Sequence, residues 1–183
     1  MQKFSSKKKN KRVFNTYVID PDSIEVLRSK HIVLDTNFLL DASIFSEEAA
    51  DLIGQLRDID CDLLTTKLVI AETLGGTKDE MALQKKIGYL EILFGRELNH
   101  IVSLPIERGL PSSADMLAFS RQCNKFDPID FELYLTLKKY KLSGILLITR
   151  NHRDFTSKIC KRVGFITLLG DKEIKTYGIY QAN

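Results

Sequence analysis

Residues 31–40, His31-Ile32-Val33-Leu34-Asp35-Thr36-Asn37-Phe38-Leu39-Leu40, are the stretch that decides how the chain is interpreted. An apolar run ends at Asp35, and the chain becomes apolar again at Phe38. Such a run predicts a strand buried in a parallel sheet. Ligands of open α/β sheets bind beyond the carboxyl ends of the strands, which is where Asp35 would lie, with Thr36 and Asn37 as polar neighbours. On this stretch alone, Asp35 can equally be the cap of a helix that begins at Phe38.

Similar patterns along the chain predict strands that alternate with helices. We expect a short extended piece at 16–19, strands at 31–34, 63–66, 100–106, 145–149 and 165–169, and helices at 23–29, 46–56, 67–74, 79–98, 112–119, 129–140 and 154–162. The residues after Asp171 show no pattern that places them. The alternation predicts an α/β fold with a central, mostly parallel sheet of about five strands and helices on both faces.

The composition predicts a soluble globular protein. Of the 183 residues, 44% are hydrophobic and 28% are charged, and this length suits one domain, which we expect at 16–183. No apolar stretch approaches the roughly 20 residues that span a membrane, and the first residues lack the apolar core of a signal peptide. Three widely spaced cysteines, Cys61, Cys123 and Cys160, favour reduced thiols and a cytoplasmic location.

A basic arm is predicted at residues 1–15, which are poor in apolar residues and which we expect to be disordered. It contains Lys3, Lys7, Lys8, Lys9, Lys11 and Arg12, with no acidic residue among the first twelve. The rest of the chain has 21 basic and 24 acidic residues, so it is mildly acidic. The arm suits binding to the phosphate backbone of a nucleic acid, although a solvated leader has the same composition.

Three further acidic positions follow predicted strands or open predicted helices. Glu72 lies in the apolar stretch Leu68–Leu74, where a carboxylate is costly to bury unless it is paired or bound to a metal. Leu68 and Glu72 would share a helix face, which argues against a purely solvent-facing Glu72. Asp127, Pro128 and Asp130 have the chemistry of a helix start, but an acid there can also reach a site beyond the strand ends.

The last acidic position belongs to Thr149-Arg150-Asn151-His152-Arg153-Asp154, after the predicted strand at 145–149. Asn151 and Asp154 would offer oxygen ligands near the end of that strand, although Asp154 can also open the next helix. Arg150 and Arg153 are suited to phosphate contact, or they form a solvated turn. Four carboxylates without histidine or thiolate partners favour Mg²⁺ or Mn²⁺ over Zn²⁺. No phosphate-binding glycine loop of the GxGxxG or GxxxxGK[ST] type is present.

Four segments together resemble the successive motifs of PIN-domain nucleases. They are Leu34–Leu40, Val69–Glu72, Asp130-x-x-Leu133 and Leu147–Phe155, and the resemblance spans residues 31–169. It implies a three-layer α/β/α fold and cleavage of RNA by water activated with one or two Mg²⁺ or Mn²⁺ ions. It also implies that Asp35, Glu72, Asp130 and Asp154 are the catalytic, metal-binding acids. Asp130 matches the third motif better than Asp127, because Leu133 follows it three places on.

The last motif departs from the family pattern, since Asn151 stands where the fourth acid often follows the Thr-x pair. Asp154 would then take over, with Asn151 as a further metal ligand and with Thr36, Asn37 and Thr149 as supporting residues. Lys7, Lys8, Lys9, Lys11, Arg12, Arg150 and Arg153 would bind RNA. The family resemblance allows an RNA-processing nuclease or the toxin of a toxin–antitoxin pair, with a homodimer and an antitoxin or processing complex as partners. A degenerate scaffold for RNA or protein, or a nuclease for structured DNA, are the alternative functions.

Overall fold

The computed structural model describes residues 16–95, 112–122, 126–170 and 173–183. Its six strands are β1 (Thr16–Ile19), β2 (His31–Leu34), β3 (Asp62–Leu64), β4 (Leu146–Thr149), β5 (Cys160–Leu169) and β6 (Ile174–Ala182). Its seven α-helices are α1 (Pro21–Leu27), α2 (Thr36–Ile44), α3 (Ser46–Asp58), α4 (Lys67–Leu74), α5 (Glu80–Phe94), α6 (Ser113–Ser120) and α7 (Pro128–Lys139). The expected α/β class is therefore confirmed for the described part of the chain.

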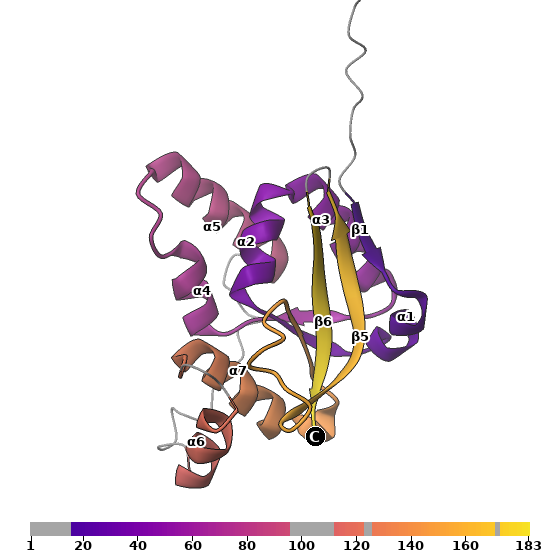
Figure 1. The fold of residues 1–183 in the computed structure, drawn as a ribbon. Coiled ribbons are helices and arrows are strands. Elements are labelled where there is room, and N and C mark those ends of the chain that lie inside the picture. The colour runs from indigo at the N-terminus through magenta and orange to yellow at the C-terminus, as the bar shows by residue number, and fades with distance from the viewer. Residues whose placement is uncertain (1–15, 96–111, 123–125, 171–172) are drawn as a thin grey trace, which may run out of the picture.

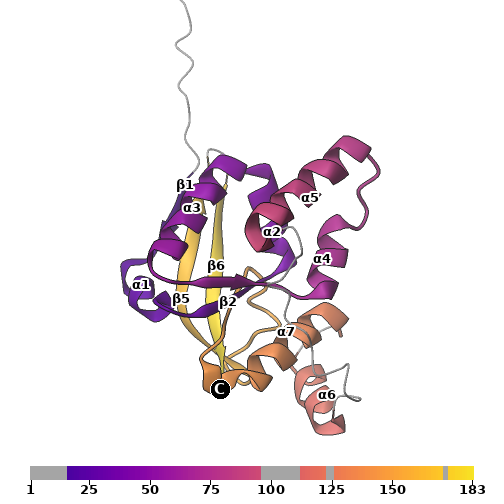
Figure 2. The ribbon, with the colours of Figure 1, turned by 180° about the vertical axis from the view of Figure 1, so that it is seen from behind.

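The six strands form one mixed sheet in the order β1-β5-β6-β4-β2-β3. Only β3, β2 and β4 are parallel to one another, whereas β6 pairs antiparallel with β4 and β5, and β1 pairs antiparallel with β5. The expectation of a mostly parallel sheet of about five strands thus holds for one half of the sheet. In both ribbon views β2 crosses the direction of the long β5 and β6, so the sheet is curled (Figures 1 and 2).

The helices are distributed unevenly over the sheet. Helix α3 lies behind β5 and β6 in Figure 1 and α2 lies to the left of β6, and among the described residues no helix lies in front of these two strands. The view from behind shows α2 beside α4 and α5, with α7 below them (Figure 2). This arrangement gathers α2, α4 and α7 around the end of the parallel strands.

The burial of both faces of β2 and β4 explains why these strands have continuous apolar sequences. Both strands lie inside the sheet, and their residues Ile32–Leu34 and Leu146–Thr149 are buried on both faces, as is typical of parallel strands. Leu34 and Phe38 are fully buried on either side of Asp35, so the polar residue is fixed between two anchored apolar ones. The position of Asp35 is therefore determined by packing as well as by its own hydrogen bonds.

One predicted helix is absent from the part of the chain that the structure describes, and one segment that the sequence left unplaced is a strand. Residues 154–162 are not a helix: turns lead into β5, which begins at Cys160 and includes the strand expected at 165–169. Phe155 and Ile159 are both buried, and their spacing imitates one face of a helix. The residues after Asp171, which the sequence left unplaced, include β6. The strand expected at 100–106, the end of the helix expected to reach residue 98, and the basic arm fall outside the described residues.

Candidate functional site

Asp35 lies at the carboxyl end of β2 and is also the N-cap of α2, which begins at Thr36 and not at the expected Phe38. Its backbone N–H donates to the carbonyl of Ile148 in β4 at 3.2 Å, which aligns the ends of the two parallel strands. Its buried carboxylate accepts hydrogen bonds from the backbone N–H of Thr36 at 2.6 Å and from the Thr149 hydroxyl at 2.6 Å. The Asn37 amide donates to the same carboxylate. Three groups thus fix the Asp35 side chain.

Asn37 and Thr149 connect Asp35 with the loop after β4. The Asn37 amide also donates to the Thr149 hydroxyl oxygen at 3.1 Å, and its carbonyl accepts from the Arg150 backbone N–H at 3.0 Å. The backbone N–H of Asn151 donates to the Thr149 hydroxyl oxygen at 2.9 Å. The structure therefore brings the expected supporting residues Asn37 and Thr149 into direct contact with Asp35.

Asp130 enters the site from the first turn of α7. Asp127 caps this helix by accepting from the backbone N–H groups of Ile129 at 2.8 Å and Asp130 at 3.4 Å, and Pro128 occupies the first turn. Asp130 is only 9% exposed, and its carboxylate accepts from the Asn151 amide at 2.8 Å. The helix-start chemistry is thus present, and it holds Asp130 at the end of the parallel strands.

Glu72 reaches the site in a different way from the one expected. It lies on the exposed side of α4, and Leu68, which shares its face, is itself 40% exposed. The argument that apolar neighbours bury Glu72 is therefore wrong. Glu72 nevertheless lines the same cavity as Asp35, and its charge acts on Asp35.

Asn151 and Asp154 form the far end of the group. The Asn151 side-chain NH₂ donates at 2.8 Å to Asp130 and at 2.8 Å to Asp154, so one amide bridges two carboxylates. Asn151 was expected to bind a metal through its carbonyl oxygen, but here its nitrogen faces the acids. Asp154 lies behind this bridge and is not among the residues that line the cavity.

These side chains surround a cavity of about 280 Å³, here called the acid pocket. Its lining consists of the carboxylates of Asp35, Glu72, Asp127 and Asp130, the polar Thr36, Asn37 and Asn151, and the apolar Leu40 and Ile129. No lysine or arginine is among the described residues that line it. The pocket therefore concentrates negative charge contributed by three separate parts of the chain.

The electrostatics of the acid pocket disfavour ionised carboxylates. Burial, together with the charge of Glu72, raises the pKa of Asp35 to about 6, although its hydrogen bonds from Thr149, Thr36 and Asn37 oppose the shift. Burial raises the pKa of Asp130 to about 7, and the charges of Asp35, Asp127 and Asp154 add to this effect. An ionised carboxylate in the pocket thus makes ionisation of its neighbours less favourable.

The residues of the acid pocket suit a hard divalent cation by two observations. The carboxylates and the Thr36 hydroxyl offer oxygen ligands, and the carboxylates lack a cationic partner among the described residues that line the pocket. In addition, the buried hydroxyl of Thr36 has no hydrogen-bond partner among the described residues. As they stand, however, no three Asp, Glu, His or Cys side chains in the described ranges form a group that could hold a metal ion. Closing them around an ion requires side-chain rotation, including that of the Asn151 amide.

Glu132 is a further buried acid, which the sequence analysis did not identify. It lies on α7 and is 3% exposed, and it accepts a hydrogen bond from the hydroxyl of Thr66, the N-cap of α4. Burial raises its pKa. The Thr66–Glu132 hydrogen bond joins the helix that carries Glu72 to the helix that carries Asp130. An acid two places after Asp130 gives no signal by itself, because its partner is distant in the sequence.

Thr66→Ala should lower the free energy of unfolding by about 2–4 kcal/mol, because the helix loses its cap and the buried Glu132 loses its partner. Thr66→Ser, which keeps the hydroxyl, should retain most of this stability. Urea unfolding of the two variants measures the difference. Equal losses in both would mean that the methyl group, and not the hydrogen bond, is what matters.

The expected RNA-binding residues are only partly described. Arg153 is exposed, and Arg150 pairs with Asp41, an acid that the sequence analysis did not single out. The five basic residues expected from the arm lie outside the described ranges. Within those ranges, no helix is long and apolar enough to cross a membrane.

Comparisons with known proteins add no relative. No protein-family model matches the chain, and neither the curated proteins nor the solved structures contain a significant match. The functional argument therefore depends on the acid pocket and on the sequence motifs that surround it.

Proposed function

We propose that this chain is a metal-dependent endoribonuclease with a PIN-like three-layer fold and the acid pocket as its active site. The convergence of Asp35, Glu72 and Asp130 on one cavity carries the proposal. These three acids come from β2, α4 and α7, and the cavity lies at the carboxyl end of the parallel strands, where ligands of α/β sheets bind.

The chain would hold one or two Mg²⁺ or Mn²⁺ ions chiefly through Asp35 and Asp130, with Glu72 closing the pocket from α4. Such an ion supplies a nucleophilic water at neutral pH and offsets charge on the phosphate. Asn37 and Thr149 orient the Asp35 carboxylate, and Asn151 orients that of Asp130. Hydrogen bonds of this kind fix the direction of a ligating carboxylate, and the Asn151 amide would have to rotate for the cation to bind.

RNA is proposed as the substrate because of the family resemblance and the basic arm. A nuclease for structured DNA uses the same kind of acid pocket, so substrate choice is a matter for direct comparison. Single-stranded RNA and flap DNA, offered separately with Mn²⁺, separate the two. Cleavage of the flap alone would exclude the ribonuclease.

One observation favours a second candidate, a binding scaffold without catalytic activity. The Asn151 amide nitrogen lies between Asp130 and Asp154, and in that orientation it donates a hydrogen bond to each carboxylate without any metal. A scaffold would keep this bridge permanently. An enzyme has to open it on the side of Asp130.

Calorimetric titration with Mn²⁺ distinguishes the two candidates. We expect binding by the wild-type protein at pH 8 and clearly weaker binding at pH 6, because protons compete for Asp35 and Asp130 below about pH 7. Glu72→Gln should weaken binding about 10-fold or more, since the pocket loses a carboxylate. Asp51→Asn, on the exposed side of α3, changes the same charge away from the pocket and is the control. A titration without heat at both pH values would support the scaffold.

A further inference from the structure

Asp41 is a buried carboxylate of α2 that accepts hydrogen bonds from three side chains outside its own helix. Its side chain is 8% exposed. One oxygen accepts from the Lys175 ammonium at 2.7 Å, and the other from the Tyr177 hydroxyl at 2.6 Å and from the Arg150 guanidinium at 3.0 Å. Lys175 and Tyr177 belong to β6, whereas Arg150 belongs to the loop after β4.

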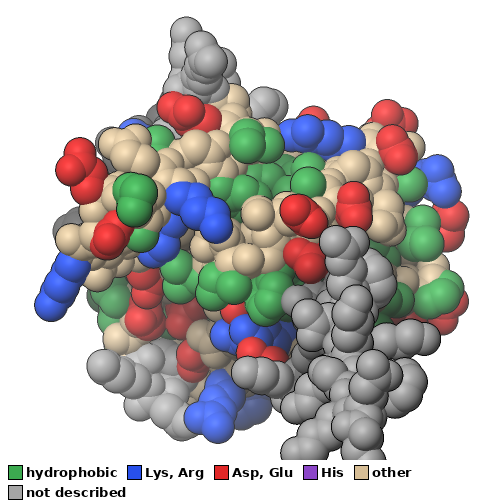
Figure 3. Space-filling model, turned by 90° about the horizontal axis from the view of Figure 1, so that it is seen from above, with side chains coloured by type: hydrophobic (Ala, Val, Ile, Leu, Met, Phe, Trp, Pro, Cys, Tyr) green, Lys and Arg blue, Asp and Glu red, His purple; other side chains and the backbone are tan. Residues whose placement is uncertain are grey.

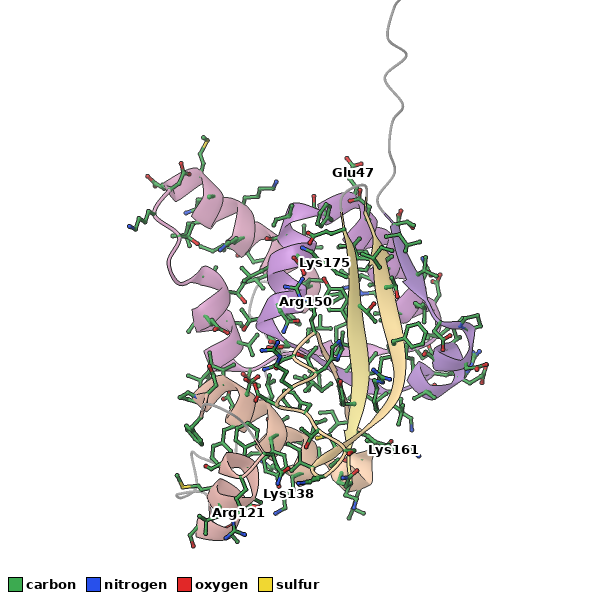
Figure 4. All side chains as sticks on the ribbon, in the orientation of Figure 1. Glu47, Arg121, Lys138, Arg150, Lys161 and Lys175 are labelled. Atoms are coloured by element: carbon green, nitrogen blue, oxygen red, sulfur yellow. The ribbon has the colours of Figure 1, made fainter. Side chains whose placement is uncertain are left out.

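The two cations on Asp41 differ in exposure. Lys175 is 13% exposed and is also bound to Glu173 at 2.9 Å, so its charge is compensated inside the protein. The Arg150 side chain is 41% exposed, and Asp41 is its only hydrogen-bond partner among the described residues. Figure 4 shows Arg150 and Lys175 close together, between β6 and α2. A guanidinium has five N–H donors, so most of those of Arg150 face solvent.

Arg150 is held rigidly at the edge of the acid pocket. Its backbone N–H donates to Asn37, and its neighbours in the chain, Thr149 and Asn151, contact Asp35 and Asp130. Asp35 and Asp41 are separated by six residues of α2, which is about 9 Å along a helix. The guanidinium therefore lies beside the acid pocket and not in it.

The acid pocket creates a need for such a cation. A polyanionic strand approaching four carboxylates is repelled, and the described residues that line the pocket offer no lysine or arginine. On the face seen from above, basic side chains are separated from one another by acidic and hydrophobic ones, so this face offers no continuous basic patch (Figure 3). Arg150, which lies next to the pocket and is oriented by Asp41, is suited to contact a neighbouring phosphate.

We infer that Arg150 binds the phosphodiester adjacent to the one in the acid pocket, and that Asp41 is the positioning residue that orients it. Asp41 holds one side of the guanidinium, which leaves the remaining N–H groups in the fork geometry that suits a phosphate. The inference names a substrate contact for the proposed nuclease and so rests on the proposed function.

The affinity for a fluorescein-labelled single-stranded RNA, measured by anisotropy in Ca²⁺ buffer with a gel to confirm that the RNA stays intact, tests the contact. Arg150→Ala should weaken binding about 5- to 10-fold and lower the slope of log K against log salt by about 0.7, the value for one phosphate. Lys161→Ala removes one positive charge at the start of β5, away from Arg150, and is the matched control (Figure 4). Lys161→Ala should leave both quantities almost unchanged.

Asp41→Asn tests the positioning role. In the wild-type background it should lower RNA affinity and the salt slope nearly as much as Arg150→Ala does, although Arg150 is still present. In the Arg150→Ala background it should cause no further loss of affinity, whereas a purely structural role would add its effect in both backgrounds. Thermal unfolding identifies any protein that has lost its fold, and Lys175→Met serves as a second way to disturb Asp41 without removing Arg150.

The outcomes separate this inference from the proposed function. Wild-type cleavage that depends on Asp35, together with equal RNA affinities for Arg150→Ala and Lys161→Ala, overturns the phosphate contact and leaves the nuclease standing. Weakened binding in Arg150→Ala and Asp41→Asn without any wild-type cleavage supports the contact and contradicts the nuclease. Absence of RNA binding by the wild-type protein overturns the inference.

Discussion

Asp35→Asn should reduce Mg²⁺- or Mn²⁺-dependent cleavage of RNA by roughly 10²- to 10³-fold or more, while the protein remains folded. The expected size follows from the several kcal/mol that a bound metal ion contributes to stabilising a transition state. Asn can still cap α2, but it lacks the charge that a cation requires. Cleavage assays on labelled RNA with and without EDTA measure the effect.

The control for Asp35→Asn is Asp51→Asn, which should cleave RNA as the wild type does. Circular dichroism and a thermal melt establish that the Asp35 variant is folded. If a folded Asp35→Asn protein cleaves RNA at the wild-type rate, the acid pocket is not the active site.

Asp130→Asn should make the metal-free protein more stable at pH 8, by about 1–3 kcal/mol. The folded-state pKa of Asp130 is raised from 3.8 to about 7. Between these values the folded protein holds a proton that the unfolded chain releases, so the contribution of Asp130 to stability is greatest below about pH 4 and is lost as the pH rises through 7. An uncharged amide removes this loss. The expected gain in the free energy of unfolding is smaller than the full pKa shift suggests, because the repulsion between Asp130 and Asp35 contributes to the titration of both groups.

Urea unfolding between pH 4.5 and 8, in EDTA, tests the Asp130 variant. The wild-type free energy of unfolding should fall over this range more steeply than that of Asp130→Asn. Saturating Mn²⁺ should restore stability to the wild type at pH 8, because a ligand that binds only the folded state stabilises it, and should do so much less for the variant. A variant that is less stable than the wild type at pH 8 in EDTA would contradict the electrostatic account.

Local sequence patterns were enough to predict that Asp35 ends a buried strand and that Asp130 lies in the first turn of a helix. The run Ile32–Leu34 is buried on both faces, so its hydrophobicity is continuous, and the polar residue that ends it has to lie at the edge of the sheet. Asp127 and Pro128 likewise identified the start of α7 and therefore the position of Asp130. In both places the residues that form the strand end or the helix start also fix the position of the candidate site residue, Asp35 or Asp130.

Prediction failed where partners distant in the chain decide the structure. Residues 154–162 have the apolar spacing of a helix, but pairing of β5 with β6 overrides it from Cys160 onward. β6 was missed because its polar Lys175 and Thr176 precede a buried stretch, Tyr177–Tyr180, which pairs with two other strands. Glu72 lines the acid pocket, but the reason given for its burial was wrong, since Leu68 of α4, which was expected to bury it, is itself exposed.

The place of β6 in the sheet has a consequence for biosynthesis. β6 lies between β4 and β5 in the sheet, yet it follows every other described element in the chain. Its Lys175 and Tyr177 bind Asp41, the residue that pairs with Arg150. During translation, Asp35 and Thr149 emerge before β6, the strand that joins β4 to β5. A chain that lacks residues 174–182 contains all four acids but leaves an open sheet edge beside them, so the sheet next to the acid pocket is complete only once β6 has been added.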